Sequence, residues 1–250
     1  MNILIFDTET VNLEKPFCYN IGYVIYDTLE NKQVLRKEFI VEQIWHNLPL
    51  FSTAYYNNKR EIYVSRMRGK HIKMMKWGYI MREMCKDIED YEIAQAYAYN
   101  SDFDERVFEH NCEWFKTINP FDNVAIFDIR GYVHQFIAFN KDFQMFCDRH
   151  ELYTDGGNYS TTAETVYRYV SGETDFAEEH TALADSLIEL EILLFCLEQG
   201  AYLGGNFKVY QSIPRQEPKS MKIIVDGVEE FCVDYKSKRV YKDKICFYTE

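Results

Sequence analysis

Five residues of the sequence are of types that can bind divalent cations and move a proton. They are four carboxylates and one histidine, in the order Asp7, Glu9, Asp104, His180 and Asp185. Carboxylate oxygens are the ligands that Mg²⁺ and Mn²⁺ prefer, and a histidine can act as a general base near neutral pH. If these side chains converge, they form a site for two divalent cations with a base beside it. Such a site can hydrolyse phosphodiester bonds.

Asp7 and Glu9 follow an apolar run that predicts a buried strand over residues 2–7. Because side chains two apart on a strand share one face, both carboxylates are expected on the same side of the sheet. Burial of two like charges is unfavourable, and a divalent cation relieves it. The alternative is a strand end with a solvated Asp-Thr-Glu turn.

Asp104 ends the run Asn-x-x-Phe-Asp, which begins at Asn100. The run follows a predicted strand over 92–99 and opens a predicted helix over 104–115. A helix N-terminus favours a carboxylate and sets its direction. The alternative is that Asp104 only caps this helix.

His180 and Asp185 bracket the start of a strong helical pattern over residues 181–199. His180 is expected just before the first turn. Asp185 is expected to face inward if the helix packs on the sheet. The alternative for His180 is a surface histidine beside the acidic neighbours Glu178 and Glu179.

The remaining pattern predicts a strand meander followed by alternating strands and helices. Further strands are expected over 19–26, 34–41 and 123–128, and further helices over 70–90, 129–137, 141–150 and 161–170. This order is typical of an α/β layer fold with a mixed sheet.

The character of the chain changes after Gly200. Short β-like runs recur over 207–211, 221–225, 231–235, 239–241 and 245–248, and Asp226-Gly227 is a hairpin turn signal. We therefore expect a first domain over 1–202 and a small β-rich C-terminal appendage over 206–250, which offers a surface for a protein partner.

Composition argues against a membrane or secreted protein. The chain has 250 residues and no apolar run long enough for a transmembrane helix, and it starts as a strand rather than as a signal peptide. Its 7 cysteines are scattered singly without a C-x-x-C pair, which argues against a zinc site. Reduced thiols and a cytoplasmic location are expected.

The net charge of −12 at first argues against a nucleic-acid partner. Lysine, arginine and aromatic residues nevertheless gather in a basic segment, residues 55–86, which includes Arg66, Arg68 and Lys70. Such a mixture suits single-stranded nucleic acid, which needs phosphate neutralisation and stacking surfaces. The alternative is a solvated helix face with a few core aromatics.

The three acidic motifs together resemble those of the DEDD superfamily of 3′–5′ exonucleases. The motifs are Asp-Thr-Glu-Thr from Asp7, Asn-x-x-Phe-Asp from Asn100 and His-x-Ala-x-x-Asp from His180. The histidine matches the His variant, because the Tyr variant would have tyrosine where this chain has Thr181. The resemblance covers residues 1–200, and Asn20-Ile21-Gly22 is similar to the family's Glu-Ile-Gly.

The resemblance implies a ribonuclease H-like fold, a mixed five-stranded sheet flanked by helices. It also implies two divalent cations, Mg²⁺ or Mn²⁺, with Asp7, Glu9 and Asp185 holding one and Asp7 with Asp104 serving the other. His180 is then the general base. The expected nucleic-acid contacts, listed together, are Thr10, Asn100, Phe103, Arg66, Arg68 and Lys70.

The implied activity is removal of nucleoside 5′-monophosphates from the 3′ ends of DNA, with single strands favoured. One alternative is an exoribonuclease or an enzyme that trims oligoribonucleotides, and another is a non-catalytic nucleic-acid-binding module. The sequence departs from the family pattern at Val11-Asn12-Leu13, where Thr-Gly-Leu is common. The surface that packs the terminal base is therefore expected to differ.

Overall fold

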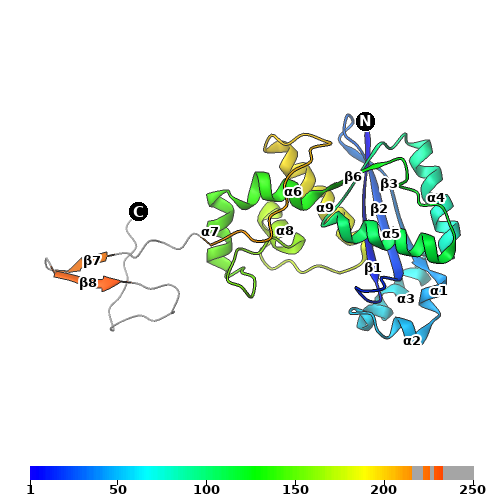
Figure 1. Ribbon diagram of the computed structural model, residues 1–250, viewed down its shortest axis with the longest axis horizontal. Coiled ribbons are helices and arrows are strands. Elements are labelled where there is room, and N and C mark those ends of the chain that lie inside the picture. Colours follow the sequence, from blue (N-terminus) through cyan, green and yellow to red (C-terminus); the bar gives the residue numbers. More distant parts are fainter. Residues whose placement is uncertain (216–221, 226–227, 233–250) are drawn as a thin grey trace.

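A mixed six-stranded sheet lies between flanking helices (Figure 1). The computed structural model describes residues 1–215, 222–225 and 228–232. The strand order is β4-β3-β2-β1-β5-β6. The strands are β1 (Asn2–Thr10), β2 (Cys18–Asp27), β3 (Lys32–Val41), β4 (Lys73–Met75), β5 (Gln95–Ala98) and β6 (Ala125–Asp128). The first three form the expected antiparallel meander, whereas β4, β5 and β6 each run parallel to their neighbour.

The prediction of five strands is corrected by β4, which pairs with the end of β3 through Met74 and Ile40. This stretch was expected to open a helix at residue 70, but α4 begins only at Trp77. A three-residue edge strand is too short to show a period of two. Its conformation comes from hydrogen bonding to β3, which the local sequence does not reveal.

Both faces of the sheet are covered, by α4 (Trp77–Asp90) on one side and α9 (Ala182–Glu198) on the other (Figure 1). Alternation along β1 divides the core accordingly. Leu4 and Phe6 belong to the cluster beneath α4, and Ile3 and Ile5 belong to the cluster beneath α9. Five further helices follow β5, namely α5 (Ser101–Phe115), α6 (Ile129–Val133), the π-helix η2 (His134–Ala138), α7 (Lys141–His150) and α8 (Ala163–Ser171).

The N-terminus of α9 lies directly on β2. A Cβ atom at Gly22 would stand only 2.1 Å from the backbone nitrogen of Leu183, so glycine is required for this approach. The side-chain oxygen of Asn20 accepts a hydrogen bond from the backbone N–H of Ala182 at 2.9 Å. These contacts set the position of Asp185 relative to the sheet.

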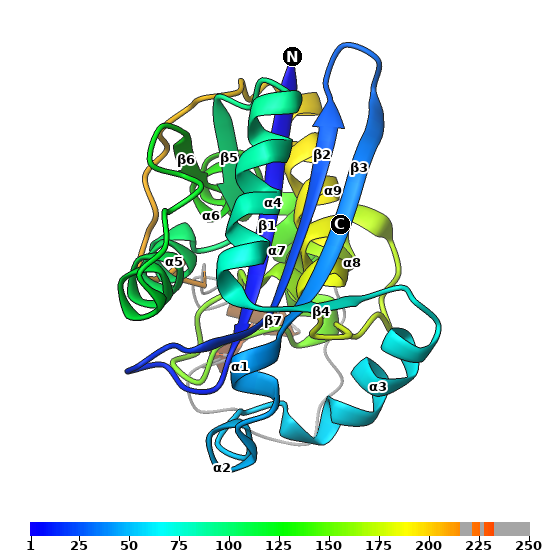
Figure 2. The same cartoon turned by 90° about the vertical axis from the view of Figure 1, so that its right-hand side faces the viewer.

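The segment between β3 and β4, residues 42–72, is called here the insert. It holds α1 (Glu42–Trp45), α2 (Leu48–Phe51), the 3₁₀-helix η1 (Asn57–Lys59) and α3 (Arg60–Arg68). Figure 2 shows these helices gathered at the end of the sheet where β1 finishes. Trp45, Phe51 and Tyr63 form an aromatic core with the ring of Tyr19 from β2. The insert is therefore anchored to the sheet.

Residues 206–213, which the sequence placed in the appendage, pack against the first domain. The ring of Phe207 lies 4.7 Å from that of Tyr132, and Ile213 forms a β-bridge with Tyr159. The expected run at 207–211 is not a strand.

Further along, β7 (Lys222–Val225) and β8 (Val228–Cys232) pair antiparallel, as expected of a β-rich region. The Asp226-Gly227 turn and the β-like runs near 240 and 246 lie outside the described residues, and the division at 202–206 stays a prediction. None of the helices in the described part of the chain has the length and apolar composition needed to cross a membrane.

Candidate active site

The structure brings together three of the predicted carboxylates, Asp7, Glu9 and Asp185. One oxygen from each lies within 4.8 Å of the others. Asp7 and Glu9 continue the face of β1 that carries Ile3 and Ile5, which is the face covered by α9. The period of two therefore places both carboxylates opposite α9, as the sequence predicted.

Asp104 joins the site from α5 and is buried. The hydroxyl of Thr8, which lies between Asp7 and Glu9, donates a hydrogen bond to Asp104 at 2.5 Å between Oγ1 and Oδ1. Asn100, the residue before α5, adopts the left-handed conformation, with φ of 63°, which asparagine tolerates better than most residues. This turn directs the first residues of α5 at β1.

Burial, and then the crowding of negative charge, raises the pKa of every carboxylate in the site. Burial, followed by the charge of Glu178, raises the pKa of Asp7 to about 7. Burial, followed by the charge of Asp7, raises the pKa of Asp185 to about 9. The same two causes, in the same order, raise the pKa of Glu9 and of Asp104. Each group is therefore less favourable as an anion than an ordinary carboxylate.

The site fits hard divalent cations. Within the described residues, no lysine or arginine forms an ion pair with any of the four carboxylates. The Oδ1 atom of Asp185 is buried and has no hydrogen-bond partner in that part of the chain. Clustered oxygen ligands that form no ion pair with a cationic side chain of the described residues are a donor set suited to Mg²⁺ or Mn²⁺.

A further buried carboxylate, Glu189, lies one turn beyond Asp185 on α9. Its Oε2 accepts a hydrogen bond from the backbone N–H of Tyr99 at 3.2 Å. Burial, followed by the charges of Asp7 and Asp104, raises its pKa. Our sequence analysis missed Glu189. The available signal was a glutamate four residues after Asp185 within an apolar helix.

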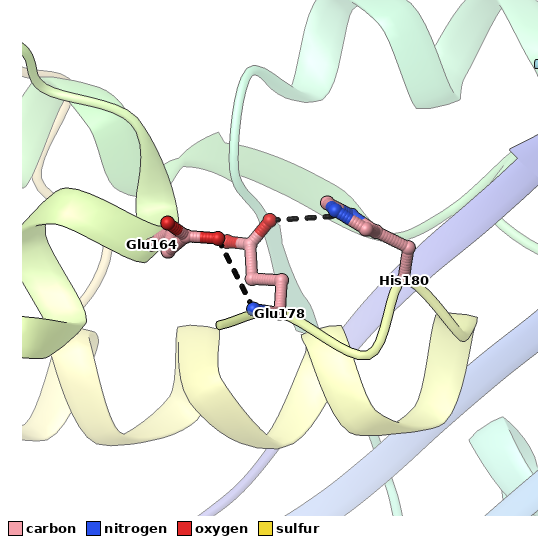
Figure 3. Close-up of side chains that lie close together, drawn as sticks. All are labelled: Glu164, Glu178 and His180. Atoms are coloured by element: carbon pink, nitrogen blue, oxygen red, sulfur yellow. Dashed lines mark hydrogen bonds and ion pairs between the residues drawn. The ribbon is translucent and has the colours of Figure 1, made fainter. Parts of the chain in front are cut away.

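His180 lies just before α9, as predicted, and its ring faces Glu178 of the same loop, with Glu164 of α8 nearby (Figure 3). Its Nδ1 lies 3.4 Å from Oε2 of Glu178, and the backbone N–H of Glu178 donates to Glu164 at 3.1 Å. These three residues form a second group of possible cation ligands. Burial, followed by the positive charge of Lys59, lowers the pKa of His180, which favours the neutral imidazole.

A pocket of about 430 Å³ adjoins the carboxylates. Thr10 and Phe103, two predicted nucleic-acid contacts, line it together with Glu9. The insert contributes Tyr55 and Tyr56 to the lining. The pocket therefore combines a carboxylate edge with aromatic surfaces, and its size is in the range of ordinary ligand sites.

The unusual Val11-Asn12-Leu13 stretch also lines this pocket. Asn100, in contrast, is outside its lining, and its backbone N–H donates to Asp128.

The predicted basic contacts differ in their surroundings. The guanidinium of Arg66 pairs with Glu38 at 2.8 Å and with Glu179 at 3.2 Å. Arg68 and Lys70 are exposed at the end of α3. A role for these three residues in binding nucleic acid stays a prediction, and Arg66 already has partners within the fold.

The mixed sheet, with its flanking helices and the order of these elements, is the ribonuclease H-like fold of the DEDD 3′–5′ exonucleases. The nuclease domain of 3′hExo, a DEDDh family member solved with rAMP, matches with a TM-score of 0.54 and 11% identity, over 85% of this chain and 97% of that one. A full-length 3′-exonuclease matches with a TM-score of 0.50 and 12% identity, over 86% of this chain and 68% of that one.

Exonuclease I of E. coli, solved with a dT13 oligonucleotide, matches with a TM-score of 0.51 and 13% identity, over 78% of this chain. The matched part is 40% of the length of Exonuclease I. No protein-family model and no curated protein matches the chain by sequence. The similarity in structure establishes the fold, and the activity is argued from the site.

Proposed function

We propose that this protein is a metal-dependent 3′–5′ exonuclease that favours single-stranded DNA and releases nucleoside 5′-monophosphates. The observation that carries the proposal is the convergence of Asp7, Glu9 and Asp185 within 4.8 Å, with Asp104 hydrogen-bonded to the same strand. Burial and mutual repulsion raise the pKa of these carboxylates, and the charge of Lys59 offsets this only in part at Glu9 and Asp185. A fold gains nothing in stability from such an arrangement, which is typical of a catalytic site.

Asp7, Glu9 and Asp185 would hold one cation, and Asp7 with Asp104 would serve a second. When bound, two such cations stabilise the incoming and leaving oxygens of an in-line displacement at phosphorus. Bound cations would favour the ionised form of the ligand carboxylates, because their positive charge opposes the effects of burial and of the neighbouring negative charges.

His180 would take the proton from the attacking water. Its lowered pKa keeps the imidazole neutral and able to accept. The carboxylate of Glu178, beside Nδ1, would stabilise the imidazolium that forms. The water oxygen bonds to the phosphorus of the terminal nucleotide as the bond from phosphorus to the preceding O3′ breaks. The aromatic wall of the pocket offers the exposed ring of Tyr55 for stacking of a base.

The test is digestion of a 5′-labelled single-stranded oligonucleotide with Mg²⁺ or Mn²⁺. We expect shortening from the 3′ end, inhibition by EDTA and no cleavage of a 3′-blocked substrate. Asp7→Ala should abolish the activity, whereas Asp90→Ala, at an exposed position at the end of α4, should retain it. Equal activity of Asp7→Ala and the wild type would refute the proposal.

RNA is the second candidate substrate. The similar folds include an enzyme domain solved with rAMP and an enzyme solved with dT13, so both sugars occur among them. Contacts to the 2′-hydroxyl decide between RNA and DNA. Digestion of matched DNA and RNA oligonucleotides, compared by kcat/KM, distinguishes these substrates. Tight binding without turnover of either would favour a non-catalytic binding module.

A further inference from the structure

Four residues of the insert make side-chain contacts with the loop that carries the proposed general base. The loop, residues 177–181, is called here the base loop. We propose that α3 and η1 position His180 for catalysis. The catalytic part of this inference rests on the proposed function. Its mechanical part, that the insert holds the base loop in place, can be tested without any activity.

The base loop needs support from outside itself. His180 has φ of 51°, in the left-handed region that a side chain with a Cβ atom rarely adopts. Thr181 stands at the N-cap position of α9 but makes no capping hydrogen bond. A backbone in this conformation persists only where surrounding contacts hold it.

Two residues of the insert hold the loop backbone on either side of the Cα atom of His180. Nζ of Lys59 donates to the carbonyl oxygen of Glu179 at 2.6 Å. The hydroxyl of the buried Tyr63 donates to the carbonyl oxygen of His180 at 3.3 Å. Consecutive carbonyl groups are therefore bound to neighbouring turns of the insert.

Arg66 connects the loop to the central sheet. Its Nη1 donates to Oγ1 of Thr181 at 2.9 Å and contacts Glu179, and its Nη2 lies 2.8 Å from Oε2 of Glu38. The side chain of Glu38, on β3, is fully buried. The fork of a guanidinium suits such a bridge between two groups, because its donors are rigidly arranged. The charge of Arg66 therefore serves a contact within the fold.

The orientation of the imidazole itself is set by stacking. The ring of Tyr56 lies parallel to that of His180, with 4.2 Å between centroids and 14° between planes. Nζ of Lys59 lies over the same tyrosine, 4.8 Å from its centroid. Figure 3 shows the edge of the imidazole directed at Glu178. Backbone and ring are thus both held, which a positioned proton acceptor requires.

Hydrogen exchange tests the mechanical part. In Arg66→Ala, the backbone amides of residues 177–182 should exchange at least tenfold faster than in the wild type. Arg68→Ala, exposed on the same helix, should leave them unchanged. Loss of Arg66 leaves Glu38 buried without its partner, so the double variant Arg66→Ala/Glu38→Gln is measured as well. The single variant Lys59→Met tests a second contact with the loop. Unchanged exchange in all three folded variants would overturn the inference.

Kinetics test the catalytic part. If oligonucleotides are degraded, Arg66→Ala should lower kcat at least tenfold and change KM less than twofold, and Arg66→Lys should recover part of the loss. In a His180→Ala background, Arg66→Ala should cause no further loss, because both changes act through one imidazole. Arg36→Ala, exposed on β3, is the activity control.

Two results for Arg66→Ala would overturn the inference and make Arg66 a phosphate contact instead. One is a raised KM with unchanged amide exchange in the base loop, and the other is a further loss of activity in the His180→Ala background. If the wild type degrades no oligonucleotide, the proposed function fails, and the exchange measurement still decides whether the insert holds the base loop.

Discussion

Thr8 and Asp104 are joined by a buried hydrogen bond of 2.5 Å that connects the central strand to the first turn of α5. The bond connects side chains 96 residues apart. It fixes the fourth acidic residue of the site, and the same contact lowers the pKa of Asp104 against the larger effect of burial.

Thr8→Val should therefore weaken both the fold and the site. Removal of the hydroxyl leaves a buried carboxylate oxygen without its donor, and the expected loss is about 1–3 kcal/mol of unfolding free energy. Urea denaturation measures it, and Mn²⁺ affinity by calorimetry should fall as well. Thr8→Ser, which keeps the hydroxyl, is the control and should retain most of both properties.

Asp7→Asn should stabilise the protein in the absence of metal. The pKa of Asp7 is raised to about 7, so at pH 8 its ionised form opposes folding. We expect the Tm in EDTA to rise by a few degrees. With Mg²⁺ the wild type should gain stability through binding, and the variant should gain much less. A variant less stable than the wild type in EDTA would contradict this account, and Asp90→Asn is the neutral control.

Gly22→Ala should displace α9 from β2. The new methyl group would overlap the backbone of Leu183, which cannot rotate away as a side chain would. Overpacking of this kind costs about 1–3 kcal/mol or more. Thermal unfolding should show the loss, and Mn²⁺ affinity should fall because Asp185 moves with the helix. Gly172→Ala, in open space but with φ of 76°, controls for the loss of a glycine alone.

His134 should make stability fall in acid. Its Nδ1 accepts the backbone N–H of Tyr210 and its Nε2 contacts the hydroxyl of Thr161, and burial lowers its pKa from 6.5 to about 4. The unfolded chain therefore binds a proton at higher pH than the native protein.

Stability due to neutral His134 is complete above about pH 6.5 and is lost as the pH falls toward 4, by up to about 3 kcal/mol. Urea denaturation at pH 7 and pH 4.5 should show a smaller loss for His134→Gln than for the wild type. An equal loss in both would exclude His134 as the cause.

Local patterns predicted several parts of the fold and site correctly. The run before Asp7 indicated a buried strand, and its period of two placed Asp7 and Glu9 on one face, because that geometry belongs to the strand itself. The helix after His180 was predicted from its own apolar pattern, which is likewise a property of the local sequence. The convergence of Asp7 with Asp185 could be predicted only from the resemblance to known motifs.

Features that depend on distant partners were missed. β4 takes its conformation from β3, and the start of α5 is set by the left-handed Asn100 rather than by a capping side chain. The basic segment had two interpretations, a surface for phosphates or a solvated helix face, and neither included the contacts of Arg66 with Glu38 and the base loop.

The sequence by itself determined the kinds of chemical groups available and the faces of the elements that carry them. Only the tertiary structure decided which groups meet: Asp104 with Thr8, His180 with Tyr56, and Arg66 with Thr181. The physical reason is range. Periodicity and backbone preference act over a few residues, whereas these contacts join segments far apart in the chain and form only when the sheet and its helices have packed.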